Sequence, residues 1–133
     1  MNYLLDTHIA IWAVFSPDYI SNSVKEILLN PKNEIFTSTI SFWEISLKYG
    51  LGKLQLRGEN PEIIKHELVN TCDIKIIDIT LEDTLSFYKL TTFHHKDPFD
   101  RMLIWQALRY KLTFITDDQK VHKYADCGLL VKW

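Results

Sequence analysis

Short runs of apolar residues alternate along the chain with longer stretches in which apolar residues recur every three or four positions. The short runs are typical of strands, and the longer stretches are typical of amphipathic helices. The runs predict strands at residues 3–6, 34–38, 74–77, 113–116 and 129–133. The intervening stretches predict helices at residues 7–15, 21–30, 39–50, 60–70, 81–90, 97–111 and 118–125.

The order of these elements predicts the class of fold. Strands of four or five residues that alternate with helices indicate βαβ units, and hence an α/β protein with a mainly parallel sheet and helices on both faces. The strands are nearly continuous apolar runs, as expected when both faces of a sheet are covered. In such open sheets a ligand binds beyond the carboxyl ends of the strands. Polar residues that directly follow a strand are therefore the first candidates for a site.

Helix caps and stops define the boundaries of several helices. Ser21 and Asn60 stand at predicted N-caps, and Pro61 would then occupy the first helical position. On the helix at residues 39–50, Ile40, Trp43, Leu47 and Leu51 recur at helical spacing and predict a buried stripe.

Composition places the chain among globular proteins. It has 133 residues, of which 47% are hydrophobic and 24% charged, and this fits a single domain with a core of its own. The longest apolar run, residues 9–15, is far shorter than the roughly 20 residues that span a membrane. No basic segment precedes it, so we expect no secretory signal. Cys72 and Cys127 have no metal-binding spacing and are expected to be reduced thiols in a cytoplasmic protein.

Two acidic residues are candidate site residues because of their positions on predicted elements. Asp6 ends the first strand, where it either caps the next helix or faces the crevice of the sheet. Glu44 lies beside the apolar stripe of its helix. It either pairs with Lys48 one turn later or is a partly buried carboxylate that needs a cation, a metal or a hydrogen bond.

Further acids stand at the starts of two later helices. Asp97 is a good N-cap, because Pro98 follows it. Asp100 is either the reciprocal arm of a capping box or a carboxylate at the head of the buried face. Asp117 and Asp118 follow the fourth strand, and only one of them is needed as a cap.

Taken together, Asp6, Glu44, Asp100 and Asp118 predict an acidic cluster at the crevice. Such an all-oxygen cluster selects a hard cation, Mg²⁺ or Mn²⁺, which serves phosphoryl chemistry. Other chemistries have no signal, because the chain lacks glycine-rich phosphate loops, a GxSxG motif and zinc-ligand spacing. His94 and His95 are predicted to be loop histidines. The net charge of −2 argues mildly against nucleic-acid binding, but a bound metal would offset it.

At these same residues the sequence resembles the PIN-domain family, in particular the VapC-like ribonuclease toxins of type II toxin–antitoxin pairs. Four segments carry the resemblance, and they occur in the order and spacing of the family. They are LLDTH at residues 4–8, SFWEI with GLGKL at residues 41–54, HKDPFDRMLI with a following Gln106 and Ala107 at residues 95–107, and FITDD at residues 114–118.

The resemblance implies a three-layer α/β sandwich with a central, mainly parallel five-stranded sheet, and it makes residues 1–133 a single PIN-like domain. It implies hydrolysis of RNA, a cognate antitoxin protein as partner, and a homodimer. Carried over by position, the acids that bind Mg²⁺ or Mn²⁺ are Asp6, Glu44, Asp100 and Asp118. The spacing of the last motif favours Asp118 over Asp117, while Asp97 is interpreted first as a cap.

The same resemblance suggests secondary roles and leaves alternatives open. Thr7 and Ser41 are candidate polar neighbours of the acids, and Arg101, Lys48 and Lys53 are candidate phosphate contacts. A surplus of large apolar residues predicts an exposed patch for a partner, drawn from Ile9, Ile11, Trp12, Phe15, Leu51, Leu54 and Leu56. The alternatives are a metal-dependent nuclease acting on DNA or structured RNA, and a catalytically silent PIN module that binds RNA or protein.

Overall fold

The computed structural model describes residues 1–133 and contains one sheet of five strands, all of them parallel. The strand order is β3-β2-β1-β4-β5, with β1 in the centre. The strands are β1 (Asn2–Leu5), β2 (Glu34–Ser38), β3 (Lys75–Ile77), β4 (Thr113–Ile115) and β5 (Val131–Lys132). The predicted α/β class and the parallel five-stranded sheet are therefore confirmed.

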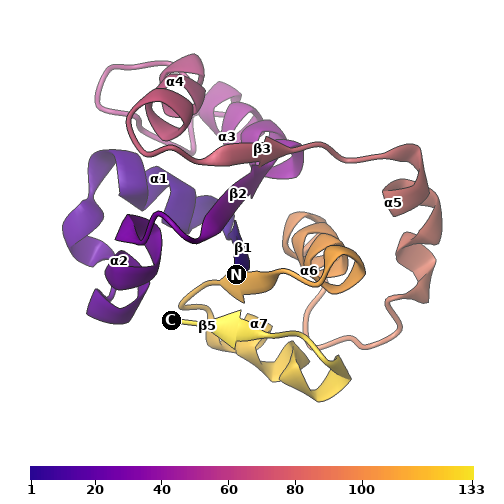
Figure 1. Cartoon of the computed structure of the whole chain (residues 1–133). Helices are drawn as coiled ribbons and strands as arrows, with labels where there is room; N and C mark the ends of the chain where they lie inside the picture. Colours follow the sequence, from indigo (N-terminus) through magenta and orange to yellow (C-terminus); the bar gives the residue numbers. More distant parts are fainter.

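Helices cover both faces of this sheet (Figure 1). The α-helices are α1 (Thr7–Phe15), α2 (Asn22–Leu29), α3 (Thr39–Gly50), α4 (Glu62–Asn70), α5 (Leu81–Ser86), α6 (Pro98–Tyr110) and α7 (Gln119–His122). Three short 3₁₀ segments are η1 (Pro17–Tyr19), η2 (Phe87–Lys89) and η3 (Lys123–Cys127). The last two replace the ends of helices that the sequence predicted to be longer.

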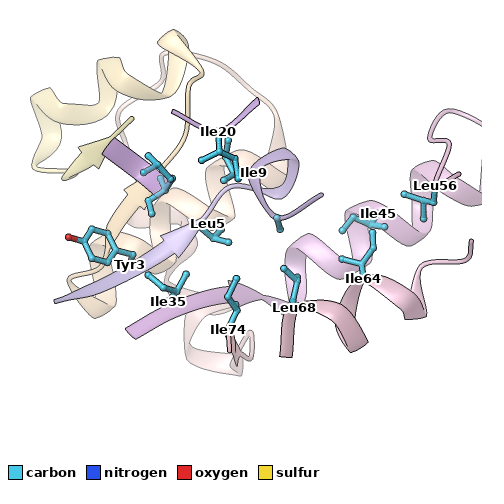
Figure 2. Close-up of a cluster of buried hydrophobic side chains, with 13 residues drawn as sticks. Tyr3, Leu5, Ile9, Ile20, Ile35, Ile45, Leu56, Ile64, Leu68 and Ile74 are labelled. Carbon is cyan, nitrogen blue, oxygen red and sulfur yellow. The ribbon is translucent and has the colours of Figure 1, made fainter. Parts of the chain in front are cut away.

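Alternation along the central strand divides the interior into two cores. Tyr3 and Leu5 of β1 point into a cluster that is completed by residues of α1, α2, α3 and α4 (Figure 2). Leu4, between them, points to the other face, where it joins residues of α6, α7 and η3. Because successive side chains of a strand point to opposite faces, one buried strand can serve both cores. This arrangement is the predicted three-layer sandwich.

The register of the strands brings their carboxyl ends to one edge. Leu5 of β1 is paired with Ile115 of β4, so the residues that follow these two strands become neighbours. The backbone N–H of Asp6 continues the ladder by donating to the carbonyl of Ile115 at 3.0 Å. β2 ends at the same edge, where Ser38 caps α3.

Two details of the predicted helices are wrong. Asn60 does not cap α4, because the helix begins at Glu62 and no side chain caps it. The apolar stripe on α3 is not buried: Trp43, Leu47 and Leu51 are exposed. The buried residues of α3 are Ser41, Glu44 and Ile45. Helical spacing located an apolar stripe correctly, but only its first residue, Ile40, packs against the core, and the others are exposed.

The predicted partner patch is also wrong in part. Ile9 and Leu56 are buried in the core, while Ile11, Trp12, Phe15 and Leu54 are half-buried and pack against it. Only Leu51 of that set is strongly exposed. Cys72 and Cys127 are free cysteines, and both are partly buried. None of the helices has the length and apolar character needed to cross a membrane.

Candidate functional site

A cavity of about 360 Å³ lies at the carboxyl edge of the sheet. Its lining is mostly polar and includes all four acids that the sequence selected, together with Asp97. These acids reach the cavity from the ends of β1 and β4, from the interior of α3 and from the start of α6. The other polar residues in its lining are Thr7, His8, Lys48 and Lys53.

Asp6 joins the sheet to the cavity. It caps α1, because its Oδ1 accepts the N–H of Thr7 at 2.7 Å, and its Oδ2 accepts the hydroxyl of Thr116 at 2.7 Å. The side chain is almost completely buried, and this burial raises the pKa of its carboxyl group. Asp6 therefore both caps α1 and lines the cavity, so the two alternatives that the sequence left open are both correct.

Glu44 is a buried acid with half of its carboxylate unpaired. Its Oε2 accepts a hydrogen bond from Lys48 Nζ at 2.6 Å, one turn along α3, whereas its Oε1 is buried and has no hydrogen-bond partner. Nearby, the hydroxyl of Thr7 donates to Ser41 Oγ at 2.9 Å and links α1 to α3. Buried polar atoms normally have partners, and Glu44 is the one residue with such an unpaired atom that lines the cavity, so this oxygen is a candidate ligand atom.

Asp100 is a second acid of the cavity whose carboxyl group is strongly perturbed. It lies in the first turn of α6, where its backbone N–H donates to the capping Asp97 at 3.0 Å. Burial raises the pKa of Asp100 to about 8, and the negative charges of Asp6, Asp97, Glu44 and Asp118 contribute further. The reciprocal arm of a capping box does not form, so the carboxylate remains available to the cavity.

The neighbouring residues Asp117 and Asp118 have different roles. Asp118 caps α7 by accepting the N–H of Lys120 at 2.9 Å, and it lines the cavity. Asp117 does not line it and instead contacts His8 Nε2 through Oδ1 at 2.5 Å. The other ring nitrogen of His8 lies 3.6 Å from Asp6 Oδ2, so His8 stands between the two aspartates.

Arg101 is not available to contact a phosphate, contrary to the sequence-based expectation. It is buried, and its guanidinium group donates to the carbonyls of Leu90 and Thr92 and to the hydroxyl of Tyr124, at 2.7–2.8 Å. Its charge also lies 4.0 Å from the centre of the Phe93 ring. Arg101 therefore holds the segment that precedes α6.

Three residues were missed by sequence reasoning: His8, which lines the cavity, and His95 and Tyr124, which lie behind Asp100. His94 and His95 do lie in a loop, but His95 Nε2 is 3.2 Å from Asp100 Oδ2. Its Nδ1 is 3.0 Å from the hydroxyl of the buried Tyr124. His95 and Asp100 are only five residues apart, and this closeness in sequence could have suggested their contact. No local pattern could have indicated Tyr124, which is 29 residues away.

The acids have the kind of donor atom that a hard divalent cation prefers, but their side chains are not close enough together to hold one ion. No three acidic, histidine or cysteine side chains are grouped closely enough to hold one ion. The donor atoms are all carboxylate oxygens, however, and one of them is buried without a partner. Oxygen donors of this kind are those that Mg²⁺ and Mn²⁺ prefer.

The fold is similar to that of several solved structures. It matches a chain of VapBC2 from Rickettsia felis, bound to a DNA fragment from its promoter, with a TM-score of 0.72, 22% identity and coverage of 99% and 98% of the two chains. It matches VapBC-1 from nontypeable Haemophilus influenzae with a TM-score of 0.66, 19% identity and coverage of 99% and 97%. It matches DNA-bound VapBC from Salmonella typhimurium with a TM-score of 0.68, 16% identity and coverage of 99% and 97% of the two chains.

Sequence comparisons give a complementary result. No curated protein matches the chain. The family model of the PIN domain does match it, over residues 3–126, which include all four acids. This match confirms the resemblance inferred from the motifs. The chain belongs to the PIN-domain family.

Proposed function

We propose that this chain is a Mg²⁺- or Mn²⁺-dependent endoribonuclease, and that it is the toxin of a toxin–antitoxin pair. The observation that carries the proposal is the convergence of four carboxylates, from four different elements, on one cavity. Keeping several negative charges in a partly buried space is unfavourable, and burial has already raised the pKa of Asp6 and Asp100. Folding alone does not require such an arrangement.

The proposed metal ligands are Asp6, Glu44, Asp100 and Asp118. A bound Mg²⁺ or Mn²⁺ would supply an activated water and would offset the charge of a phosphodiester. Asp6 is held for this task by Thr7 and Thr116, and Glu44 presents its unpaired Oε1. An acid that is not needed as a ligand would orient the attacking water.

Two lysines of the cavity supply positive charge for the substrate. Lys48 is paired with Glu44, and Lys53 lies in the same lining. Both can reach a phosphate that enters the cavity, because each has a long side chain with an exposed end. Of the three phosphate contacts expected from the sequence, these two lysines are retained and Arg101 is not.

RNA is proposed as the substrate because the sequence motifs resemble those of ribonuclease toxins. The test is incubation of the protein with labelled RNA and with DNA of matched sequence, in Mn²⁺ or in EDTA. Cleavage of RNA alone, and only with metal, supports the proposal. Cleavage of both substrates would favour the broader nuclease, and binding without cleavage would favour the silent module. We expect the protein to act in the cytoplasm, because RNA is present there and cysteines such as Cys72 and Cys127 stay reduced there.

The proposal predicts the effect of removing single charges. Asp6→Asn and Asp100→Asn should each lower RNA cleavage by ~100-fold or more, because even a residue that only orients a metal ligand contributes ~10–100-fold. Asp97→Asn should be milder, since asparagine is also a good cap. The exposed Asp18, outside the cavity, provides the control Asp18→Asn. A folded Asp100→Asn variant with the wild-type rate would refute the assignment.

The raised carboxyl pKa values predict how the metal-free protein responds to pH. The folded state retains protons on Asp6 and Asp100 at pH values where the unfolded chain has released them. Stability should therefore fall as the pH rises above about 4, and should continue to fall until it passes the folded pKa of Asp100, about 8.

This pH dependence can be measured by thermal melting in EDTA. Asp100→Asn should melt higher than the wild type at pH 8.5, and the difference should shrink towards pH 5, where the folded wild type holds its proton. Millimolar Mn²⁺ should stabilise the wild type more than the variant, because a ligand that binds only the folded state stabilises it. A difference in melting temperature that does not change with pH would show that Asp100 carries no raised pKa.

We further propose an antitoxin partner and a homodimer. The similar structures of VapBC from three organisms support the antitoxin partner. Three exposed apolar residues, Trp43 and Leu47 on α3 and Leu51 directly after it, support a protein contact at that helix. Large apolar side chains that lie close together on a surface commonly mark an interface.

Self-association can be tested by sedimentation equilibrium. Trp43→Ser and Leu51→Ser should each raise the dimer Kd by ~30-fold, since central apolar residues of an interface contribute ~2 kcal/mol each. Leu29→Ser is the matched control, because Leu29 is even more exposed but lies on α2. A strictly monomeric wild type would refute the homodimer, and a neighbouring gene whose product does not neutralise the chain would refute the antitoxin.

A further inference from the structure

The hydroxyl of Tyr124 is the centre of a buried polar network beside the cavity. Tyr124 lies on η3 and has no exposed surface. Its oxygen receives Arg101 Nη1–H at 2.8 Å and the backbone N–H of His94 at 3.2 Å. It also lies 3.0 Å from His95 Nδ1 and 3.4 Å from the carbonyl oxygen of His95.

Counting protons in this network determines which nitrogen of His95 carries hydrogen. A tyrosine oxygen accepts through two lone pairs and donates one proton. Arg101 is always protonated and the backbone of His94 can only donate, so these two groups occupy both lone pairs. A proton on His95 Nδ1 would be a third donor facing the same oxygen. The tyrosine hydroxyl must instead donate its own proton. Its two possible acceptors are Nδ1 and the carbonyl oxygen of His95, and Nδ1 is the nearer.

The consequence for the imidazole ring is a single tautomer. With Nδ1 as an acceptor, the ring carries its proton on Nε2, which lies 3.2 Å from Asp100 Oδ2. The Nε2–H group therefore donates to Oδ2 of Asp100. A group that hydrogen-bonds to a metal ligand in this way fixes the orientation of that ligand.

We propose that His95 is a positioning residue for Asp100, held as the Nε2–H tautomer by Tyr124 and Arg101. This inference rests on the proposed function, because it gives Asp100 the role of a metal ligand. One carboxylate oxygen is fixed by His95, and the other stays free for the cation. Arg101 thus serves the site indirectly, through the tyrosine hydroxyl, and not by contacting the substrate.

The chain allows a matched pair of substitutions. Glutamine places its amide nitrogen near the position of His Nε2, whereas asparagine reaches only the position of Nδ1. His95→Gln should therefore keep a donor towards Asp100, and His95→Asn should lose it. His94→Asn is the control, because the ring of His94 pairs with the exposed Asp126 at 2.8 Å and not with an acid of the cavity.

Binding of Mn²⁺ without RNA is measured by titration calorimetry. His95→Asn should weaken Mn²⁺ binding by ~10–100-fold, while His95→Gln and His94→Asn should remain close to the wild type. A purely structural role of His95 would weaken binding equally in His95→Gln and His95→Asn, which would overturn the proposal. Equal affinity in all four proteins would also overturn it.

The tautomer is measured independently by ¹⁵N–¹H long-range correlation spectra of the imidazole rings in the metal-free protein at pH 8. The signals of His95 are identified by their loss in His95→Gln. We expect a protonated Nε2 and an unprotonated Nδ1 in the wild type, and averaged signals in Tyr124→Phe. A protonated Nδ1 in the wild type would overturn the proposal. A wild type that neither binds Mn²⁺ nor cleaves RNA would overturn the proposed function, while these spectra would still decide the hydrogen-bonded arrangement.

Discussion

The mutual repulsion of carboxylates in a partly buried cavity is the constraint on which the other features of this molecule depend. Two carboxylates about 4 Å apart repel each other by roughly 1–4 kcal/mol for effective dielectric constants between 80 and 20. Burial raises the pKa of Asp100 to about 8, and the negative charges of four other acids add to that effect. The fold must therefore hold these groups together against a force that would separate them.

Rigid elements and local donors supply that restraint. The parallel register of β1 and β4 sets Asp6 beside Thr116, whose hydroxyl donates to it. Lys48 gives Glu44 a positive partner one turn away on the same helix. Asp118 is restrained by its role as the cap of α7. Each acid thus has a structural contact, and each keeps a side towards the cavity.

Much of this arrangement could be predicted from the sequence. Strand–helix alternation predicted the parallel sheet, and the positions of Asp6 at the end of the first strand and of Asp118 just beyond the fourth placed them at its carboxyl edge. The motifs around Glu44 and Asp100 carried the family resemblance that the family model confirms. These features are local in sequence or follow from a general rule of sheet topology.

The remainder could not be predicted, because it depends on contacts between distant segments or on a conflict between local and global preferences. Tyr124 reaches His95 and Arg101 only after β4 and η3 have been placed. On α3 the apolar stripe was assigned to the core, yet Ser41 and Glu44 occupy the buried side and Trp43 points outward. Functional sites are where such departures from local rules are expected.

The four acids share one cavity, and we propose that they bind a cation there. The most direct measurement is the pKa of the Asp100 carboxyl group, followed by the ¹³C chemical shift of that group during a pH titration. In the metal-free protein the pKa should be about 8, and saturating Mg²⁺ should lower it strongly, because a bound cation favours the charged form. A pKa near the ordinary value of about 3.9, unchanged by Mg²⁺, would contradict the account.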